Sequence, residues 1–189
     1  MKTALFSFLL LCTAQLSQAQ VVADVDFPEN LPANTLHPKM KLNGAALREL
    51  YLLVDTYAGA LYLEEPSQSA SQIIASEQHK TMIFHVLLDK VSARRLSSAL
   101  HEALLLNISK HQHRDLQSDI NTMLSYFSGS LKKGQQAVFH YIPNHGTQIS
   151  VAGKVKGLIA GKDFYNAMLK VWIGKSPVTR AFKDNILGL

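Results

Sequence analysis

The chain has almost no cysteine: Cys12 is the single one among 189 residues. One thiol cannot build a disulfide framework or supply the several cysteine ligands of a structural zinc or iron–sulfur site. Charge is also sparse, because only 17% of the residues are charged, and 19 basic against 14 acidic residues leave a formal charge of +5. That excess is too small to indicate nucleic-acid binding. The 47% hydrophobic content is enough for a sizeable core.

The start of the chain has the pattern of an export signal. A short basic start precedes an apolar run over residues 4–12, and Ser17 and Ala19 put small residues at the two positions that a signal peptidase reads. The pattern predicts a signal peptide over residues 1–19 and a single domain over residues 20–189. We therefore expect the mature protein in the periplasm or secreted.

Two other interpretations of this start are less favoured. The apolar run is too short to span a bilayer comfortably, so no stable membrane anchor is expected. A lipoprotein is disfavoured because three leucines precede Cys12, where small residues are usual. Cleavage would remove both Cys12 and Lys2, which leaves a chain without a thiol and with a formal charge of +4.

Hydrophobic periodicity in the rest of the chain changes between the strand and the helix pattern. The order of strands, helices, strands and helices predicts an α+β fold with a mostly antiparallel sheet and helices on one face. Gly59 is a candidate β-bulge. The predicted elements are an extended lead-in over 20–38, strands over 47–63 (two, or one bent), 81–88, 136–142, 147–151 and 154–159, and helices over 67–76, 91–109, 116–127, 164–172 and from Ser176-Pro177 to Ile186, with a polar link at 110–114.

Arg48 is the polar residue that attracts most interest. It lies near the start of a hydrophobic strand that also carries Tyr57, and a guanidinium that enters an apolar layer must be paired or hydrogen-bonded. One interpretation is a surface arginine that pairs with Glu49 or Glu64. The other is an anion clamp for a carboxylate or phenolate at the end of an apolar pocket.

The histidines indicate no metal site. His111 and His113 fall in the polar link, where a solvated loop is the expected setting, and His85 lies in an apolar strand as a core or pocket histidine. The chain contains neither a glycine-rich dinucleotide fingerprint nor a P-loop. We expect no metal and no cofactor.

Four stretches carry a resemblance to a known family. Leu42-Asn43-Gly44-Ala45-Ala46-Leu47-Arg48, followed by the strand 54–63, resembles the opening of the chalcone isomerase-like family, in which a glycine-rich step leads to an arginine. The segments 131–134 and 157–174 resemble its exported bacterial branch. The resemblance spans residues 36–188 and implies an open-faced β-sandwich, an antiparallel sheet covered by a layer of helices with a ligand cleft between them.

The resemblance also implies a site. Chalcone isomerases close a flavanone ring without a cofactor, using an arginine, a threonine and a tyrosine, with lysine and asparagine on a helix. The arginine corresponds to Arg48, and the threonine to Tyr57 or, one residue earlier, Thr56. The remaining family positions have become apolar: those of the first long helix fall near Leu96, Ala99 and Ala103, and a hydroxyl position on the late helix falls on Val171, beside Trp172.

An arginine and a tyrosine at one end of an apolar cleft resemble the fatty-acid-binding relatives of this family. We therefore expect a non-catalytic domain that binds a small amphipathic anion such as a fatty acid, with these eight residues as ligand contacts. One alternative is a cofactor-independent isomerase, an intramolecular lyase for a chalcone- or flavonoid-like ketone, with His85 or His101 supplying polar groups. Another is an interaction module of the cell envelope whose cleft is vestigial. Neither oligomeric state nor ligand identity follows from the sequence.

Overall fold

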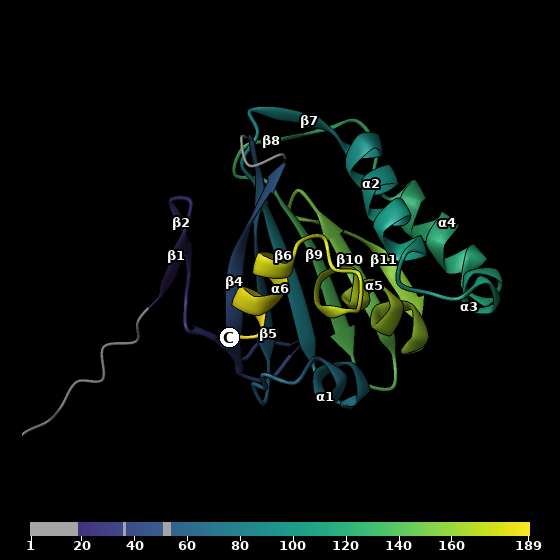
Figure 1. The fold of residues 1–189 in the computed structure, drawn as a ribbon, viewed down its shortest axis with the longest axis horizontal. Helices are drawn as coiled ribbons and strands as arrows, with labels where there is room; N and C mark the ends of the chain where they lie inside the picture. Colours follow the sequence, from purple (N-terminus) through teal and green to yellow (C-terminus); the bar gives the residue numbers. More distant parts are fainter. Residues whose placement is uncertain (1–18, 36, 51–53) are drawn as a thin grey trace, which may run out of the picture.

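A curled antiparallel sheet forms the centre of the molecule. In the computed structural model, which describes residues 19–35, 37–50 and 54–189, the seven strands lie in the order β11-β10-β9-β6-β5-β4-β3, and every neighbouring pair is antiparallel (Figure 1). The predicted α+β class and the predicted open-faced β-sandwich are both confirmed. The strands are β3 (Asn30–Leu31), β4 (Met40–Leu50), β5 (Val54–Leu63), β6 (Lys80–Val86), β9 (Gln136–Ile142), β10 (Gly146–Val151) and β11 (Lys154–Ala160).

The helices gather on one face of this sheet. Ser92 caps α2 by accepting a hydrogen bond from the Arg95 backbone N–H, and the pair β7–β8 anchors the excursion that carries α2 to α4. Helix α5 lies centrally on the sheet and is buried along most of its length. These elements are α1 (Ala70–Ala75), β7 (Lys90–Ser92), α2 (Ala93–Leu105), α3 (Lys110–Asp115), α4 (Gln117–Ser125), β8 (Ser130–Lys132), α5 (Asp163–Ile173) and α6 (Arg180–Ile186).

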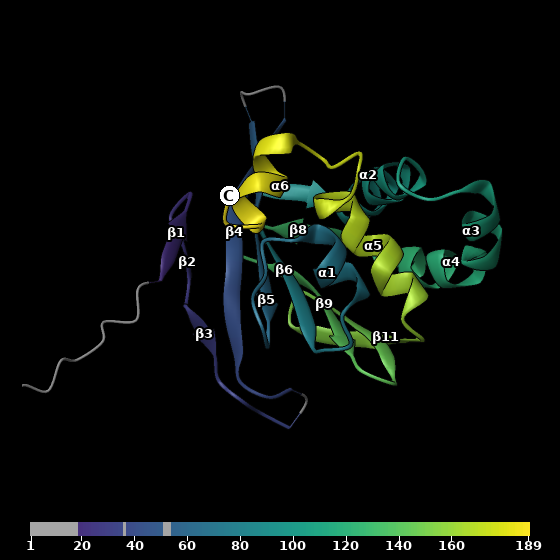
Figure 2. The same cartoon turned by 60° about the horizontal axis from the view of Figure 1, so that its bottom comes forward.

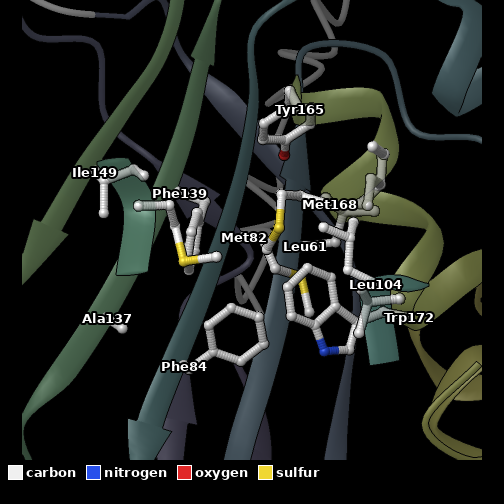
Figure 3. Close-up of a cluster of buried hydrophobic side chains, with 14 of the residues drawn as sticks. Leu61, Met82, Phe84, Leu104, Ala137, Phe139, Ile149, Tyr165, Met168 and Trp172 are labelled. Carbon is white, nitrogen blue, oxygen red and sulfur yellow. The ribbon is translucent and has the colours of Figure 1, made fainter. Parts of the chain in front are cut away.

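Strand alternation separates two cores. On the helix face, Met82 and Phe84 of β6 and Phe139 of β9 pack against Met168 and Trp172 of α5 (Figure 3). Successive strand side chains point to opposite faces, so the residues between them face the other way. There a second cluster forms around six buried side chains: Phe27, Met40, Ala45, Ala58, Ala60 and Tyr62.

The lead-in contains more regular structure than its prolines indicate. The strands β1 (Gln20–Val22) and β2 (Val25–Phe27) form a hairpin on the far side of β4 from the helices (Figures 1 and 2). The Gln20 side-chain amide imitates a strand partner, because it donates to the Ala45 carbonyl and accepts from the Ala45 N–H, both at 3.1 Å. Extended backbone was predicted here, but the hairpin and β3 were not.

The strands around Arg48 differ from the prediction in two ways. The run over 47–63 is two strands, and β4 begins seven residues earlier, at Met40, so Arg48 lies near the end of its strand rather than near its start. Gly59 pairs regularly with Ala46 and Phe84, and the irregularities fall instead between Leu42 and Gly44 and between Arg48 and Glu49. The predicted bulge at Gly59 is therefore wrong.

The β4 and β5 glycines make room for α6. A Cβ atom on Gly44 would lie 2.2 Å from the Asn185 carbonyl oxygen, and one on Gly59 would lie 2.7 Å from Cζ of Phe182. Both residues therefore allow α6 to approach the sheet closely. The absence of a side chain at both positions lets α6 pack directly on the sheet.

The prediction was wrong for one segment, which is a helix, and for the start of the last helix. The polar link over 110–114 is the helix α3, because Ser109 and Gln112 form a reciprocal capping box. Nδ1 of His111 lies 2.7 Å from a carboxylate oxygen of Asp115, one turn later. Helix α6 begins after Thr179, whose hydroxyl accepts from the Phe182 N–H at 3.1 Å, and not at Ser176-Pro177.

A buried lysine links α1 to the sheet. Lys80 is fully buried on β6, and its Nζ donates to the carbonyls of Ile73 at 3.0 Å and Ser76 at 2.8 Å at the end of α1. The ammonium also lies 5.0 Å from the centroid of the Tyr141 ring. Burial lowers the pKa of Lys80 to about 8. This lysine serves as a C-terminal cap for a helix of six residues.

Candidate functional site

A cavity of about 510 Å³ lies between the sheet and the helices. Its floor crosses four neighbouring strands, from Arg48 on β4 through Tyr57 on β5 and Phe84 on β6 to Ala137 on β9. Helix α2, α5 and the loop after α5 complete the wall. The lining residues are Arg48, Thr56, Tyr57, Phe84, Val86, Leu88, Val91, Arg95, Leu96, Ala99, Leu100, Glu102, Ala103, Leu106, Phe127, Ala137, Phe139, Val171, Trp172, Ser176, Pro177 and Val178.

Arg48 and Tyr57 form the polar end of this cavity. They are directly opposite each other in the β4–β5 ladder, so their side chains leave the same face of the sheet side by side. The irregularity after Arg48 leaves Thr56 unpaired, and the Thr56 hydroxyl donates to the Arg48 carbonyl at 2.6 Å. Thr56 thus supports the strand that carries the arginine.

The Arg48 guanidinium retains free donors. Its Nη1 donates to the backbone carbonyl of Glu49. Among the described residues, no carboxylate forms an ion pair with this guanidinium, and the predicted alternative partners Glu49 and Glu64 are not used in that way. A guanidinium presents five N–H donors, so most of them have no partner among the described residues.

Tyr57 sits in an aromatic setting. Its ring makes edge contacts with Phe84 and Phe182, at centroid distances of 5.2 and 5.8 Å. Its hydroxyl accepts a hydrogen bond from Nε1 of Trp172 at 3.1 Å. Burial raises the pKa of Tyr57 to about 12, although the Trp172 hydrogen bond and the charge of Arg48 oppose this rise. The phenol is therefore neutral at physiological pH and keeps its hydroxyl proton.

Helix α2 supplies an apolar wall. Leu96, Ala99 and Ala103 are spaced by three and four residues, so they share one face of the helix, and all three line the cavity. Arg95 and Glu102 also line it and are exposed, which places charged groups at the rim. The polar atoms therefore lie at the β4–β5 end and at the rim, with an apolar surface between them.

One side chain connects the loop after α5 to the end of α2. Asn107 follows α2, and its amide donates to the Ser176 carbonyl at 2.7 Å and accepts from the Ser176 N–H at 3.1 Å. Because Ser176 and Pro177 line the cavity, this pair of hydrogen bonds holds the loop after α5 against the end of α2. Two hydrogen bonds of one side-chain amide thereby fix the rim at this point.

The structure brings all eight predicted site residues to this one cavity: Arg48, Thr56, Tyr57, Leu96, Ala99, Ala103, Val171 and Trp172. It also adds lining residues that sequence reasoning missed, such as Phe84, Phe139 and Phe127. Strand alternation could have found the first two, because they share a face with Met82 and Ala137. No sequence signal pointed to the hydrogen bond between Trp172 and Tyr57.

The histidines considered for an enzyme lie elsewhere. His85 is on the opposite face of the sheet, where its ring meets Phe27 edge-on and its Nε2 contacts the Gln136 amide at 3.0 Å. His101 lies beside His113, with ring centroids 6.0 Å apart, and neither lines the cavity. Within the described residues, no three or more potential ligands are placed to hold a metal ion.

Comparison with known proteins decides the family. The family model described as chalcone isomerase-like matches residues 19–188. The chain belongs to the chalcone isomerase-like family. No curated protein matches the sequence. Among solved structures, the crystal structure of the fatty-acid binding protein AtFAP1 from Arabidopsis thaliana is similar, with a TM-score of 0.71 and 15% identity over 90% of this chain and 96% of that one.

Membership explains where the cavity lies. In this chalcone isomerase-like chain it lies where the resemblance implies a ligand cleft, between the sheet and the helical layer, and Arg48 lines it. Leu96, Ala99 and Ala103 of α2 line it as well. Within the described part of the chain, no helix is long and apolar enough to cross a membrane.

Proposed function

We propose that this chalcone isomerase-like chain binds a small amphipathic anion, with a fatty acid as the representative ligand, and that it is not a catalyst. The observation that carries the proposal is the pair Arg48 and Tyr57, which lie side by side at one end of a cavity that is otherwise mostly apolar. A carboxylate accepts hydrogen bonds only, and these two side chains donate them.

The chemistry of the two ends sets the ligand's orientation. A guanidinium suits the planar carboxylate, because two parallel N–H donors can meet its two oxygens. An acyl chain would then run across the strands toward Phe84 and Ala137, over a surface of aromatic and aliphatic side chains. The fold similarity to a fatty-acid binding protein supports the choice of a fatty acid as the representative ligand.

The isomerase alternative has less support from the site. Ring closure needs donors placed where negative charge develops on both the attacking phenolate and the ketone. The α2 wall offers only the apolar side chains of Leu96, Ala99 and Ala103, at the positions to which the resemblance assigns polar groups, and His85 and His101 do not line the cavity. Loss of a chalcone absorbance band beyond the spontaneous rate would favour the enzyme instead.

We also propose that the chain is exported, with its leader over residues 1–19 and its domain over residues 20–189. The support is the leader pattern of the sequence, and residues 1–18 lie outside the described residues. The intact mass of the protein from its native source tests this, since a mature form beginning at Gln20 is expected. A full-length form that begins at Met1 would contradict it.

Calorimetric titration with decanoate tests the binding proposal. Removing a hydrogen bond to a charged group costs about 1.5–3 kcal/mol, so Arg48→Ala should weaken decanoate binding by about 10- to 100-fold. The matched control is Arg94→Ala, because Arg94 is exposed on α2 and does not line the cavity. Equal decanoate affinity in the wild type and Arg48→Ala, or no binding to either, would refute the proposal.

A further inference from the structure

Trp172 is held firmly beside the polar end of the cavity. It is the single tryptophan of the chain, it is 2% exposed, and its ring lies 4.6 Å from that of Phe84 and 6.4 Å from that of Phe139, centroid to centroid. Figure 3 shows the indole between β6 and α5 with its nitrogen on the side away from Met168. The packing therefore aims the indole N–H in one direction.

That direction is the Tyr57 hydroxyl. The indole N–H is a donor and cannot accept, so at 3.1 Å the Tyr57 oxygen must be the acceptor. Phe84 and Phe182 hold the tyrosine ring from two sides. Because the indole N–H points at the phenol oxygen, the hydroxyl proton of Tyr57 must point in another direction. The tyrosine can then donate to a ligand but cannot readily accept from it.

We propose that Trp172 is a positioning residue that makes Tyr57 a dedicated hydrogen-bond donor, so that the site selects head groups that accept over head groups that must also donate. This inference rests on the proposed binding function and deepens it. Next to Arg48, which also only donates, the site favours an ionised carboxylate. A fatty alcohol would place its own hydroxyl proton in a site whose two main groups offer no acceptor.

Two ligands of equal length separate this role from simple packing. The wild type should bind decanoate more tightly than 1-decanol. Trp172→Phe keeps a ring but removes the N–H, which frees the Tyr57 oxygen to accept. Decanoate affinity should then fall about 3- to 10-fold more than 1-decanol affinity. Val171→Ala, which only removes lining volume, should lower both affinities by a similar factor.

The single indole provides a readout that needs no ligand. A ¹⁵N-labelled sample should show one indole N–H cross-peak, and Tyr57→Phe should shift that proton upfield because its acceptor is gone. An unmoved cross-peak would overturn the proposal, even if Trp172→Phe fails to fold. An unchanged ratio of decanoate to 1-decanol affinity in folded Trp172→Phe would also overturn it. Absence of decanoate binding to the wild type would instead refute the proposed function itself.

Discussion

The affinity for a fatty acid should rise with its chain length until the chain fills the cavity. Each methylene transferred from water to an apolar wall contributes about 0.8 kcal/mol, so affinity should rise about fourfold for each added methylene. The rise must end when the space is full. At about 30 Å³ per water-sized group, the 510 Å³ cavity holds about 17 such groups. The carboxyl carbon and its two oxygens take about three of them, which leaves about 14 chain carbons, so the increase should stop at an acid of about 15 carbons.

Calorimetric titration with the even-numbered acids from octanoate to octadecanoate checks this, with each ligand kept below its micelle-forming concentration. Ala137 lies on the floor, three strands from Arg48, so Ala137→Phe should move the break to shorter acids and leave the slope before it unchanged. Affinity that does not depend on chain length would show that the apolar cavity is not the binding site. An unbroken rise through octadecanoate would show that the chain is not confined there.

Two further predictions concern the frame around the site. Lys80 has a folded pKa of about 8, below its ordinary 10.5, so the unfolded state binds more protons between these values and stability should rise with pH there. Lys80→Met should abolish this rise, measured as the urea-unfolding midpoint at pH values from about 8 to about 10. A variant whose midpoint rises with pH as steeply as that of the wild type would contradict the prediction. Gly44→Ala should lower stability more than Gly59→Ala. The new Cβ atom at position 44 would meet the Asn185 backbone, whereas the one at position 59 would meet the Phe182 side chain, which can move. Thermal melts giving the reverse order would refute this.

Sequence reasoning reached the polar end of the site through the family resemblance, and local rules explain why its residues meet. The two-residue period of a strand puts Tyr57 on the helix face of the sheet, and the antiparallel ladder then places Arg48 beside it. The helical period likewise put Leu96, Ala99 and Ala103 on one face of α2. The cavity contacts of Arg95 and Glu102 and the hydrogen bond from Trp172 depend on how α2 and α5 pack on the sheet, which no local pattern determines.

The wrong predictions have local physical causes. The charged residues of α3 resemble a solvated link because no side chain of this helix is buried, and only the reciprocal cap of Ser109 and Gln112 marks it. Ser176-Pro177 has the composition of a helix start, but Asn107 binds both backbone groups of Ser176 and holds it in the rim loop. Gly59 is required by the approach of α6 and not by a bulge.

The central claim is that Arg48 and Tyr57 hold the head group of an amphipathic anion while its chain fills the cavity. A crystal structure of the decanoate complex tests it most directly. The account predicts carboxylate oxygens within hydrogen-bond distance of the Arg48 guanidinium and the Tyr57 hydroxyl, with the chain running over Phe84 toward Ala137. Decanoate bound with its carboxylate at the Arg95 rim, or outside the cavity altogether, would contradict it.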